Sequence, residues 1–102
     1  MIEPVSIRSM ASVSALGVDE MEVWASYKAG RSLISPHVIG LYSALLSRID
    51  AKNWSEINAL RENKHYKELD PSVLLAIHVA REAVAKSGWK SENIGINIGS
   101  SR

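Results

Sequence analysis

Three histidines are the side chains of this sequence best suited to proton transfer or metal binding, and they stand at positions 37, 65 and 78. A metal site needs converging ligands at a spacing such as i and i+4, and none of the three has a His, Cys or carboxylate partner regularly placed in that way. His78 falls in an apolar helical stretch and is predicted to be a packed histidine, while His65 belongs to a polar, solvated link. We assign neither a catalytic residue nor a metal ligand.

The sequence gives equally little support for a catalytic nucleophile or a cofactor-binding site. The chain has no cysteine, so these residues hold no thiolate nucleophile, no thiolate metal site and no disulfide. The terminal "GINIGSS" lacks the lysine of a phosphate-binding loop and the spacing of a dinucleotide fingerprint. Ser100 and Ser101 have no identifiable base. No catalytic residue and no cofactor is therefore expected.

The stretch 61–68 combines basic and aromatic side chains, as nucleic-acid-binding surfaces do. The residues concerned are Arg61, Lys64, Tyr66 and Lys67. Glu62 and Glu68 dilute this patch, and the whole chain balances 12 Lys and Arg against 11 Asp and Glu. A solvated link is favoured, and no nucleic-acid partner is expected.

The length and hydropathy of the chain limit the class of protein to which it can belong. A chain of 102 residues is one small domain with room for one core. No segment approaches the roughly 18 apolar residues of a membrane span, and "MIEPVSIRSM" lacks the basic and then apolar pattern of a signal segment. We expect a cytoplasmic protein with no membrane partner.

The amino-terminal third predicts a strand followed by a helix. Residues 5–12 are β-branched and small, which favours a strand, with a turn at Gly17. A helix then runs to Gly30, with Asp19 as its amino-terminal cap and Glu22 as the return half of a capping box. The side chains expected to face the core are Val23, Trp24 and Tyr27.

The middle of the chain is less regular. Residues 31–37 predict a loop around Pro36, and residues 39–49 fit either a strand or a short apolar helix, with the strand favoured. Residues 53–63 predict a short helix with Asn53 and Glu56 as a capping box. Its apolar side is formed by Trp54, Ile57 and Leu60.

The carboxyl-terminal third predicts a long helix and a strand. Asp70 suits the helix cap, Pro71 its first turn and Gly88 its end. Apolar residues occupy more than one face, so the helix should be covered on more than one side. Ile94, Ile96 and Ile98 alternate with Gly and Asn, which predicts a core strand. The result is one α/β domain over 1–102, in the order strand, helix, irregular middle, helix, strand.

Four stretches together resemble the amino-terminal portion of the β-ketoacyl synthases, condensing enzymes of fatty acid and polyketide synthesis with a thiolase-like fold. They are "VSIRSMASVSALG", "VWASYKAGRSLI", "LAIHVAREAVAKSGW" and "IGINIGSSR". The positions that fit the family motifs are Trp24, Gly30, Arg31, Ser32, Ala80, Glu82, Ala83, Gly88, Gly95, Gly99 and Ser100. Ser9 and Ala11 stand where the family usually has glycines, and Ala15 where it usually has a proline.

The resemblance implies an acyltransferase as the parent protein. In the family, a cysteine takes an acyl chain as a thioester, and two polar residues, usually histidines, promote decarboxylation of a malonyl thioester on an acyl carrier protein. Those residues lie downstream of the matched region, so no catalytic residue is carried onto this chain, which alone should be inactive. The parent is expected to be a homodimer or a synthase-like heterodimer.

Two alternatives stay open beside an amino-terminal fragment of a condensing enzyme. One is a small, complete interaction module that shares the pattern. The other is a non-catalytic synthase-like subunit that pairs with an active one.

Overall fold

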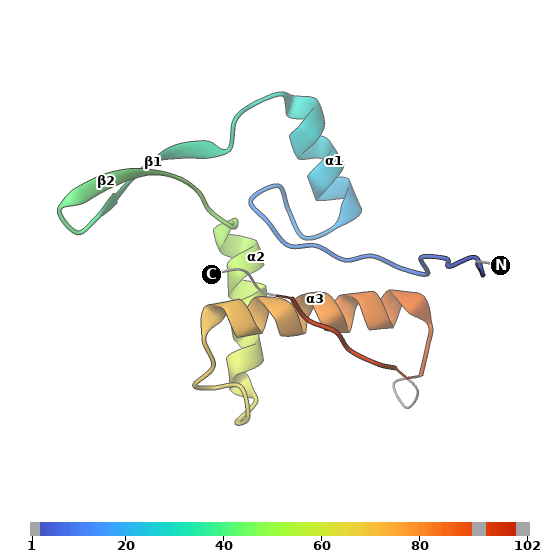
Figure 1. Ribbon diagram of the computed structural model, residues 1–102. Coiled ribbons are helices and arrows are strands. Elements are labelled where there is room, and N and C mark those ends of the chain that lie inside the picture. Colours follow the sequence, from blue (N-terminus) through green and yellow to red (C-terminus); the bar gives the residue numbers. More distant parts are fainter. Residues whose placement is uncertain (1–2, 91–93, 100–102) are drawn as a thin grey trace.

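The computed structural model describes residues 3–90 and 94–99, and this part of the chain is a mixture of helix and strand (Figure 1). The elements in order are α1 (Glu20–Ala29), β1 (Ile34–Ile39), β2 (Tyr42–Ser47), α2 (Ala51–Asn58), the 3-10 helix η1 (Ala59–Glu62) and α3 (Pro71–Ser87). α3 crosses α2, while β1 and β2 form an arm that projects away from both.

The ends of α1 and α3 confirm the predicted cap residues, but not the return half of the capping box, because the Glu22 carboxylate accepts from the Val18 amide and not from that of Asp19. Asp19 Oδ1 accepts a hydrogen bond from the Glu22 amide at 2.8 Å, and Asp70 Oδ1 accepts one from the Ser72 amide at 2.9 Å. Each helix ends at a glycine in the left-handed region, Gly30 with φ +65° and Gly88 with φ +71°. Short polar caps and terminal glycines therefore set both boundaries locally.

The helix predicted over 53–63 is present, but its predicted cap is wrong. α2 begins at Ala51, and Asp50 caps it by accepting from the Lys52 amide at 2.8 Å. Asn53 lies inside the helix and is buried. Its side chain donates to Glu22 Oε2 at 3.2 Å instead of capping, because a better cap precedes it.

The middle segment forms an antiparallel hairpin, with Ile39 opposite Tyr42 and Ile34 opposite Ser47. The strand favoured within 39–49 is confirmed for Tyr42–Ser47, whereas the loop predicted over 31–37 is wrong from Ile34 onward. Pro36 misleads there because proline is tolerated in an edge strand where its nitrogen faces away from the partner. Gly40, with φ +59°, opens the two-residue turn.

The strand predicted over 5–12 is wrong, since the structure assigns no strand to these residues. Their side chains bond instead to carbonyls in the last turns of α3. Ser9 Oγ donates to the Ala83 oxygen at 2.6 Å, and Arg8 Nε donates to the Ser87 oxygen at 3.2 Å. A strand needs a neighbouring strand for its backbone groups, and within the described residues this segment lies against a helix end.

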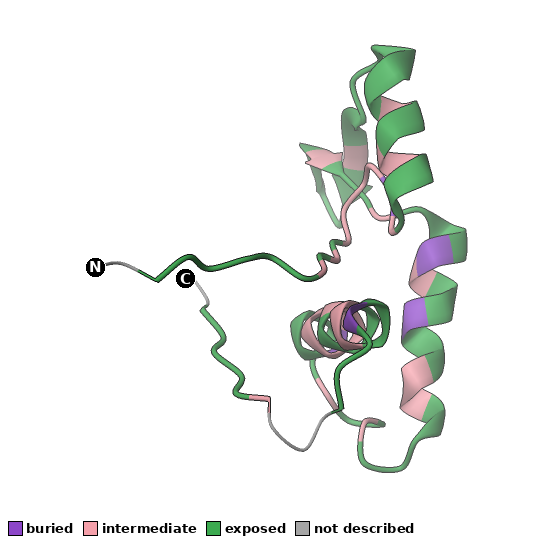
Figure 2. Ribbon diagram, turned by 90° about the vertical axis from the view of Figure 1, so that its right-hand side faces the viewer, coloured by how far each residue is buried: buried purple, intermediate pink, exposed green. Residues whose placement is uncertain are grey.

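The core lies where α2 packs on α3 (Figure 2). Ile57 and Leu74 are the apolar side chains described there as fully buried. One expectation is wrong in part: Trp24 and Tyr27 on α1 are 60% and 65% exposed, whereas Val23 is half-buried. On α3, Leu74 is buried and the five residues that follow it are half-buried, so this helix is partly covered on more than one side, while Val73 in its first turn is exposed. A helix presents its apolar residues wherever the sequence puts them, but burying them needs a partner surface.

The core strand predicted at Ile94, Ile96 and Ile98 is also wrong for residues 94–99, where the structure assigns no strand. Ile96 is 75% exposed and Ile98 is exposed as well. The predicted turn residues Ser100 and Ser101 lie outside the described residues.

The chain has an open shape. Its accessible surface is 9065 Å², against roughly 5,700 Å² for a compact monomer of this mass. Its radius of gyration is 16.6 Å, where a compact chain of this length has about 13 Å. Among the helices of residues 3–90, none combines the length and apolarity that crossing a membrane requires.

Candidate functional site

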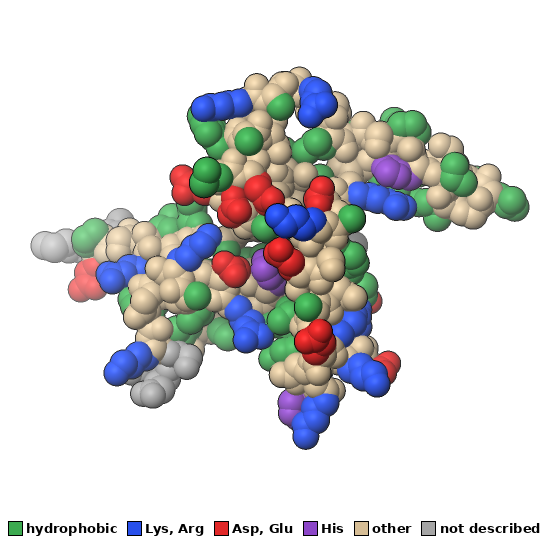
Figure 3. All heavy atoms as spheres, turned by 180° about the vertical axis from the view of Figure 1, so that it is seen from behind, with side chains coloured by type: hydrophobic (Ala, Val, Ile, Leu, Met, Phe, Trp, Pro, Cys, Tyr) green, Lys and Arg blue, Asp and Glu red, His purple; other side chains and the backbone are tan. Residues whose placement is uncertain are grey.

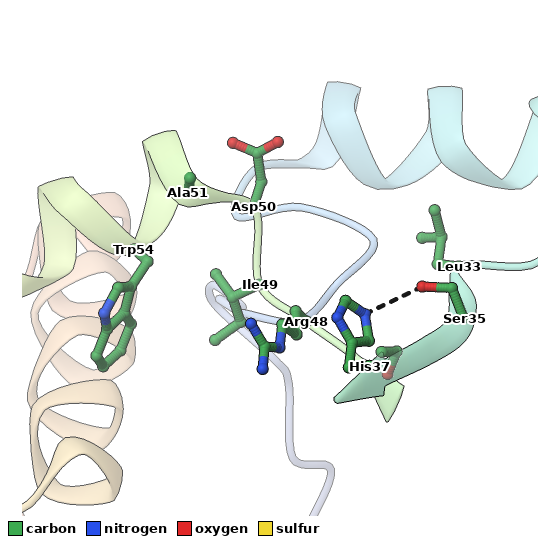
Figure 4. A pocket seen from close by; sticks show the side chains of 9 residues that line it. Leu33, Ser35, His37, Arg48, Ile49, Asp50, Ala51 and Trp54 are labelled. Carbon is green, nitrogen blue, oxygen red and sulfur yellow. Dashed lines mark hydrogen bonds between the residues drawn. The ribbon is translucent and has the colours of Figure 1, made fainter. Parts of the chain in front are cut away.

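A surface hollow of about 760 Å³ lies at the base of the hairpin, between β1 and the start of α2 (Figure 4). β1 supplies Ser35 and His37 from alternate positions, which places both side chains on one face of the strand. The segment that joins β2 to α2 supplies Arg48 and Asp50, and α2 supplies Trp54. The hollow therefore gathers a hydroxyl, an imidazole and a guanidinium.

Ser35 and His37 form the pair in this hollow that most resembles a nucleophile and its base. Ser35 Oγ lies 3.0 Å from His37 Nε2. A serine becomes a useful nucleophile when a third group orients the imidazole and donors await the oxyanion. The pair is exposed to solvent, where water competes for both groups. The hollow can hydrogen-bond a small polar ligand, but it lacks the orienting partner of a catalytic triad.

Asp50 is the carboxylate that such a triad would need, and it is committed elsewhere. Its Oδ1 accepts from the Lys52 amide as the cap of α2, and Figure 4 shows its carboxylate directed away from His37. Helix capping and imidazole orientation require different directions of one short side chain. The geometry therefore assigns Asp50 to structure.

A second hollow of about 770 Å³ runs between residues 8–12 and α1. Its walls mix exposed apolar and aromatic side chains with charges of both signs. The side chains that define it include Met10, Val23, Trp24, Tyr27 and Lys86. Lys28 Nζ lies 5.3 Å from the centre of the Trp24 ring, a surface cation–π contact. The groove is suited to contact with another chain surface rather than to chemistry.

Glu22 is the polar centre that joins the amino-terminal loop, α1 and α2. Its Oε2 accepts from the Val18 amide at 2.8 Å and from Asn53 Nδ2 at 3.2 Å. Gly17 lies against it, and a Cβ added there would overlap with the Glu22 side chain. These contacts commit Oε2 of Glu22 to positioning the amino-terminal loop, α1 and α2.

The remaining candidate residues do not converge. His65 is exposed after η1, and His78 is half-buried on α3. Within residues 3–90 and 94–99 no group of three or more His, Cys, Asp or Glu side chains is placed to hold a metal ion. Arg61 donates from Nε to Asn58 Oδ1 at 2.8 Å and from Nη1 to the Lys67 carbonyl at 2.9 Å. These two hydrogen bonds tie the 61–68 link to η1.

Sequence reasoning missed both the Ser35–His37 pair and the Glu22–Asn53 contact. The pair needed a strand over 34–39, where i and i+2 share a face, and the loop predicted around Pro36 hid that alternation. The contact joins residues 31 positions apart. Nothing local in the sequence indicates it, because Asn53 also fits a capping role.

Comparison with known proteins adds no match: no protein-family model, no curated protein and no solved structure is similar to this chain.

Proposed function

We propose that this chain is the amino-terminal part of a β-ketoacyl-[acyl carrier protein] synthase with a thiolase-like fold, inactive by itself. The parent enzyme would condense an acyl thioester with a malonyl thioester by decarboxylative Claisen chemistry. The proposal rests on the family motifs in the sequence, including "VWASYKAGRSLI" and "LAIHVAREAVAKSGW".

The large exposed surface is the observation that favours this proposal over the alternative of a self-contained binding module. The accessible surface of 9065 Å² exceeds that of a compact monomer by about 60%, and Trp24, Tyr27 and Ile96 are largely exposed. Large exposed apolar areas are a feature of surfaces that another part of an assembly covers. In a condensing enzyme the rest of the subunit would supply that cover.

The chemistry would come from groups outside these residues. In such an enzyme a helix amino terminus and a nearby histidine lower the pKa of the nucleophilic thiol, and aimed donors stabilise the oxyanion that develops in the transition state. In such an enzyme α1, α2 and α3 would belong to the scaffold of the subunit and not to its catalytic groups. The Ser35–His37 pair takes no part in the condensation.

The transcript beyond codon 102 tests the proposal directly. We expect a continuous reading frame that supplies a cysteine and, further on, two histidine motifs. The continuous polypeptide should release carbon dioxide from malonyl-[acyl carrier protein] when an acyl donor is present, and the 102-residue chain should not. A stop codon at this point overturns the proposal, and a continuous frame without the cysteine favours the non-catalytic partner subunit.

Ile96→Lys gives a second test that does not depend on activity. Ile96 is 75% exposed in this chain, so the substitution should change its free energy of unfolding by less than about 0.5 kcal/mol. In the continuous polypeptide the proposal buries Ile96 in a core strand, where an unpaired lysine should cost at least about 2 kcal/mol. Equal effects in both chains, measured by urea denaturation, contradict the proposed burial.

A further inference from the structure

The projecting hairpin has no charged side chain that would discourage its pairing with another chain. From Ser32 to Ser47 the chain has no Lys, Arg, Asp or Glu, and Arg31 and Arg48 border this stretch. Exposed edge strands usually carry charges, prolines or bulges that prevent pairing with another chain. Figure 3 shows apolar side chains along this arm, and Leu41 at its tip is 98% exposed.

One edge of the hairpin is blocked and the other is open. Ile39 and Tyr42 flank the two-residue turn, so they form a hydrogen-bonded pair, and the pairs His37–Ala44 and Ser35–Leu46 follow by alternation. Pro36 then faces the free side of β1, where it has no N–H to donate. On β2 the N–H and C=O groups of Ser43 and Leu45 point away from β1. No third strand covers that edge among the described residues.

We propose that the β2 edge of the hairpin pairs antiparallel with β2 of a second copy of this chain. The result is a four-stranded sheet in the order β1, β2, β2 and β1, with a two-fold axis beside Leu45. Both outer edges would then be β1 strands blunted by Pro36, so the assembly closes at two chains instead of growing into a filament.

The side chains of β2 fit this register. With Leu45 opposite Leu45 of the second copy, Ser43 lies opposite Ser47, and Tyr42 lies opposite Arg48. An apolar pair, two serine pairs and two cation–π pairs are all favourable across strands, and no like charges meet. Three of the exposed apolar side chains of each hairpin, Ile34, Val38 and Leu45, come to lie on one face of the combined sheet.

A bilayer is the other environment that would accept an uncharged apolar arm, and the open edge disfavours it. Lipid hydrocarbon offers no partner for the free backbone groups of Ser43 and Leu45, whereas a second β2 strand satisfies them. This inference goes beyond the proposed function.

Leu45→Lys and Val38→Lys provide a matched test, because the two side chains share one face and are 73% and 76% exposed. The lysines introduced at position 45 would face each other across the axis, whereas position 38 lies one strand away from it. Sedimentation velocity over a wide concentration range should show a monomer–dimer equilibrium for the unmodified chain. Leu45→Lys should raise its dissociation constant by at least about tenfold, and Val38→Lys by less than about threefold.

A spin label at position 45 reports the register. The chain has no cysteine, so Leu45→Cys gives a single attachment site, and dipolar spectroscopy should detect a short distance between copies. Lys64→Cys, in the distant 61–68 link, is the matched control and should give no short distance. A monomer at every concentration, equal effects of both lysine variants, open-ended oligomers, or binding to lipid vesicles in place of dimerisation would each overturn the proposal.

Discussion

At the scale of single residues, Gly17 shows how a backbone position and a side chain determine each other. Its φ of +138° lies in a region that side-chain-bearing residues rarely adopt, and its position leaves room for the Glu22 carboxylate to reach the Val18 amide. The same carboxylate accepts from the buried Asn53. One glycine thus permits the contact that joins the amino-terminal loop to α1 and α2.

Gly17→Ala should therefore lower the free energy of unfolding by about 2–4 kcal/mol, through backbone strain and overlap with Glu22. Gly88→Ala is the matched control. Its φ of +71° is also positive, but nothing lies within 4 Å of an added Cβ, so about 1 kcal/mol is expected. Urea denaturation followed by circular dichroism measures both. Equal losses in the two variants would show that Glu22 moves aside without cost.

At the scale of elements, the helices were predictable and the strands only partly so. The signals of α1 and α3 lie within their own sequences, where Asp19 and Asp70 bind amides two or three residues away. A strand is stabilised by a partner that its own sequence does not specify. Residues 5–12 and 94–98 have strand composition without a neighbouring strand, and the hairpin forms because β1 and β2 lie two residues apart.

The candidate site was harder to predict than the helices. Ser35 and His37 face one way only because a strand forms around Pro36, and Asp50 is withheld from them because it caps α2. Each of these facts depends on an element boundary that local propensity misjudged by a few residues. Side-chain convergence is sensitive to such boundaries, because a shift of one residue in a strand reverses its faces.

The cap of α3 makes stability depend on pH at the acid end. Hydrogen bonds from the Ser72 hydroxyl, at 2.7 Å, and then from the Ser72 amide hold the pKa of Asp70 below its usual range. The ionised cap therefore stabilises the fold above the unfolded-state pKa of about 3.9, and this contribution is lost as pH falls through the lower folded-state value.

Ser72→Ala removes the larger of these causes, so the Asp70 pKa should rise toward its usual value in a carbon-13 NMR titration. Asp70→Asn keeps a competent cap without a charge and should weaken the decline in stability below about pH 4. Glu20→Gln, on the exposed first turn of α1, is the control for general charge effects. An Asp70 pKa that does not move in Ser72→Ala would contradict the assigned cause.

At the scale of the whole molecule, the three α-helices and the amino-terminal segment are held together by one small core and a few specific hydrogen bonds. α2 and α3 share the described core of Ile57 and Leu74, Glu22 links α1 to α2, and Ser9 fixes the amino-terminal segment to α3. The hairpin lies outside these contacts. Such an arrangement leaves the apolar faces of α1 and of the arm available for other surfaces.

The open shape predicts what the isolated chain does in solution. Small-angle scattering of Leu45→Lys, chosen to suppress pairing through the hairpin, should give a radius of gyration well above the roughly 13 Å of a compact chain and near 16.6 Å. The same sample should bind a hydrophobic dye, because Trp24, Tyr27 and Ile98 are exposed. A compact radius together with no dye binding would mean that the chain covers its own apolar surface. The open surface would then no longer support the proposal that this chain is one part of a larger condensing enzyme.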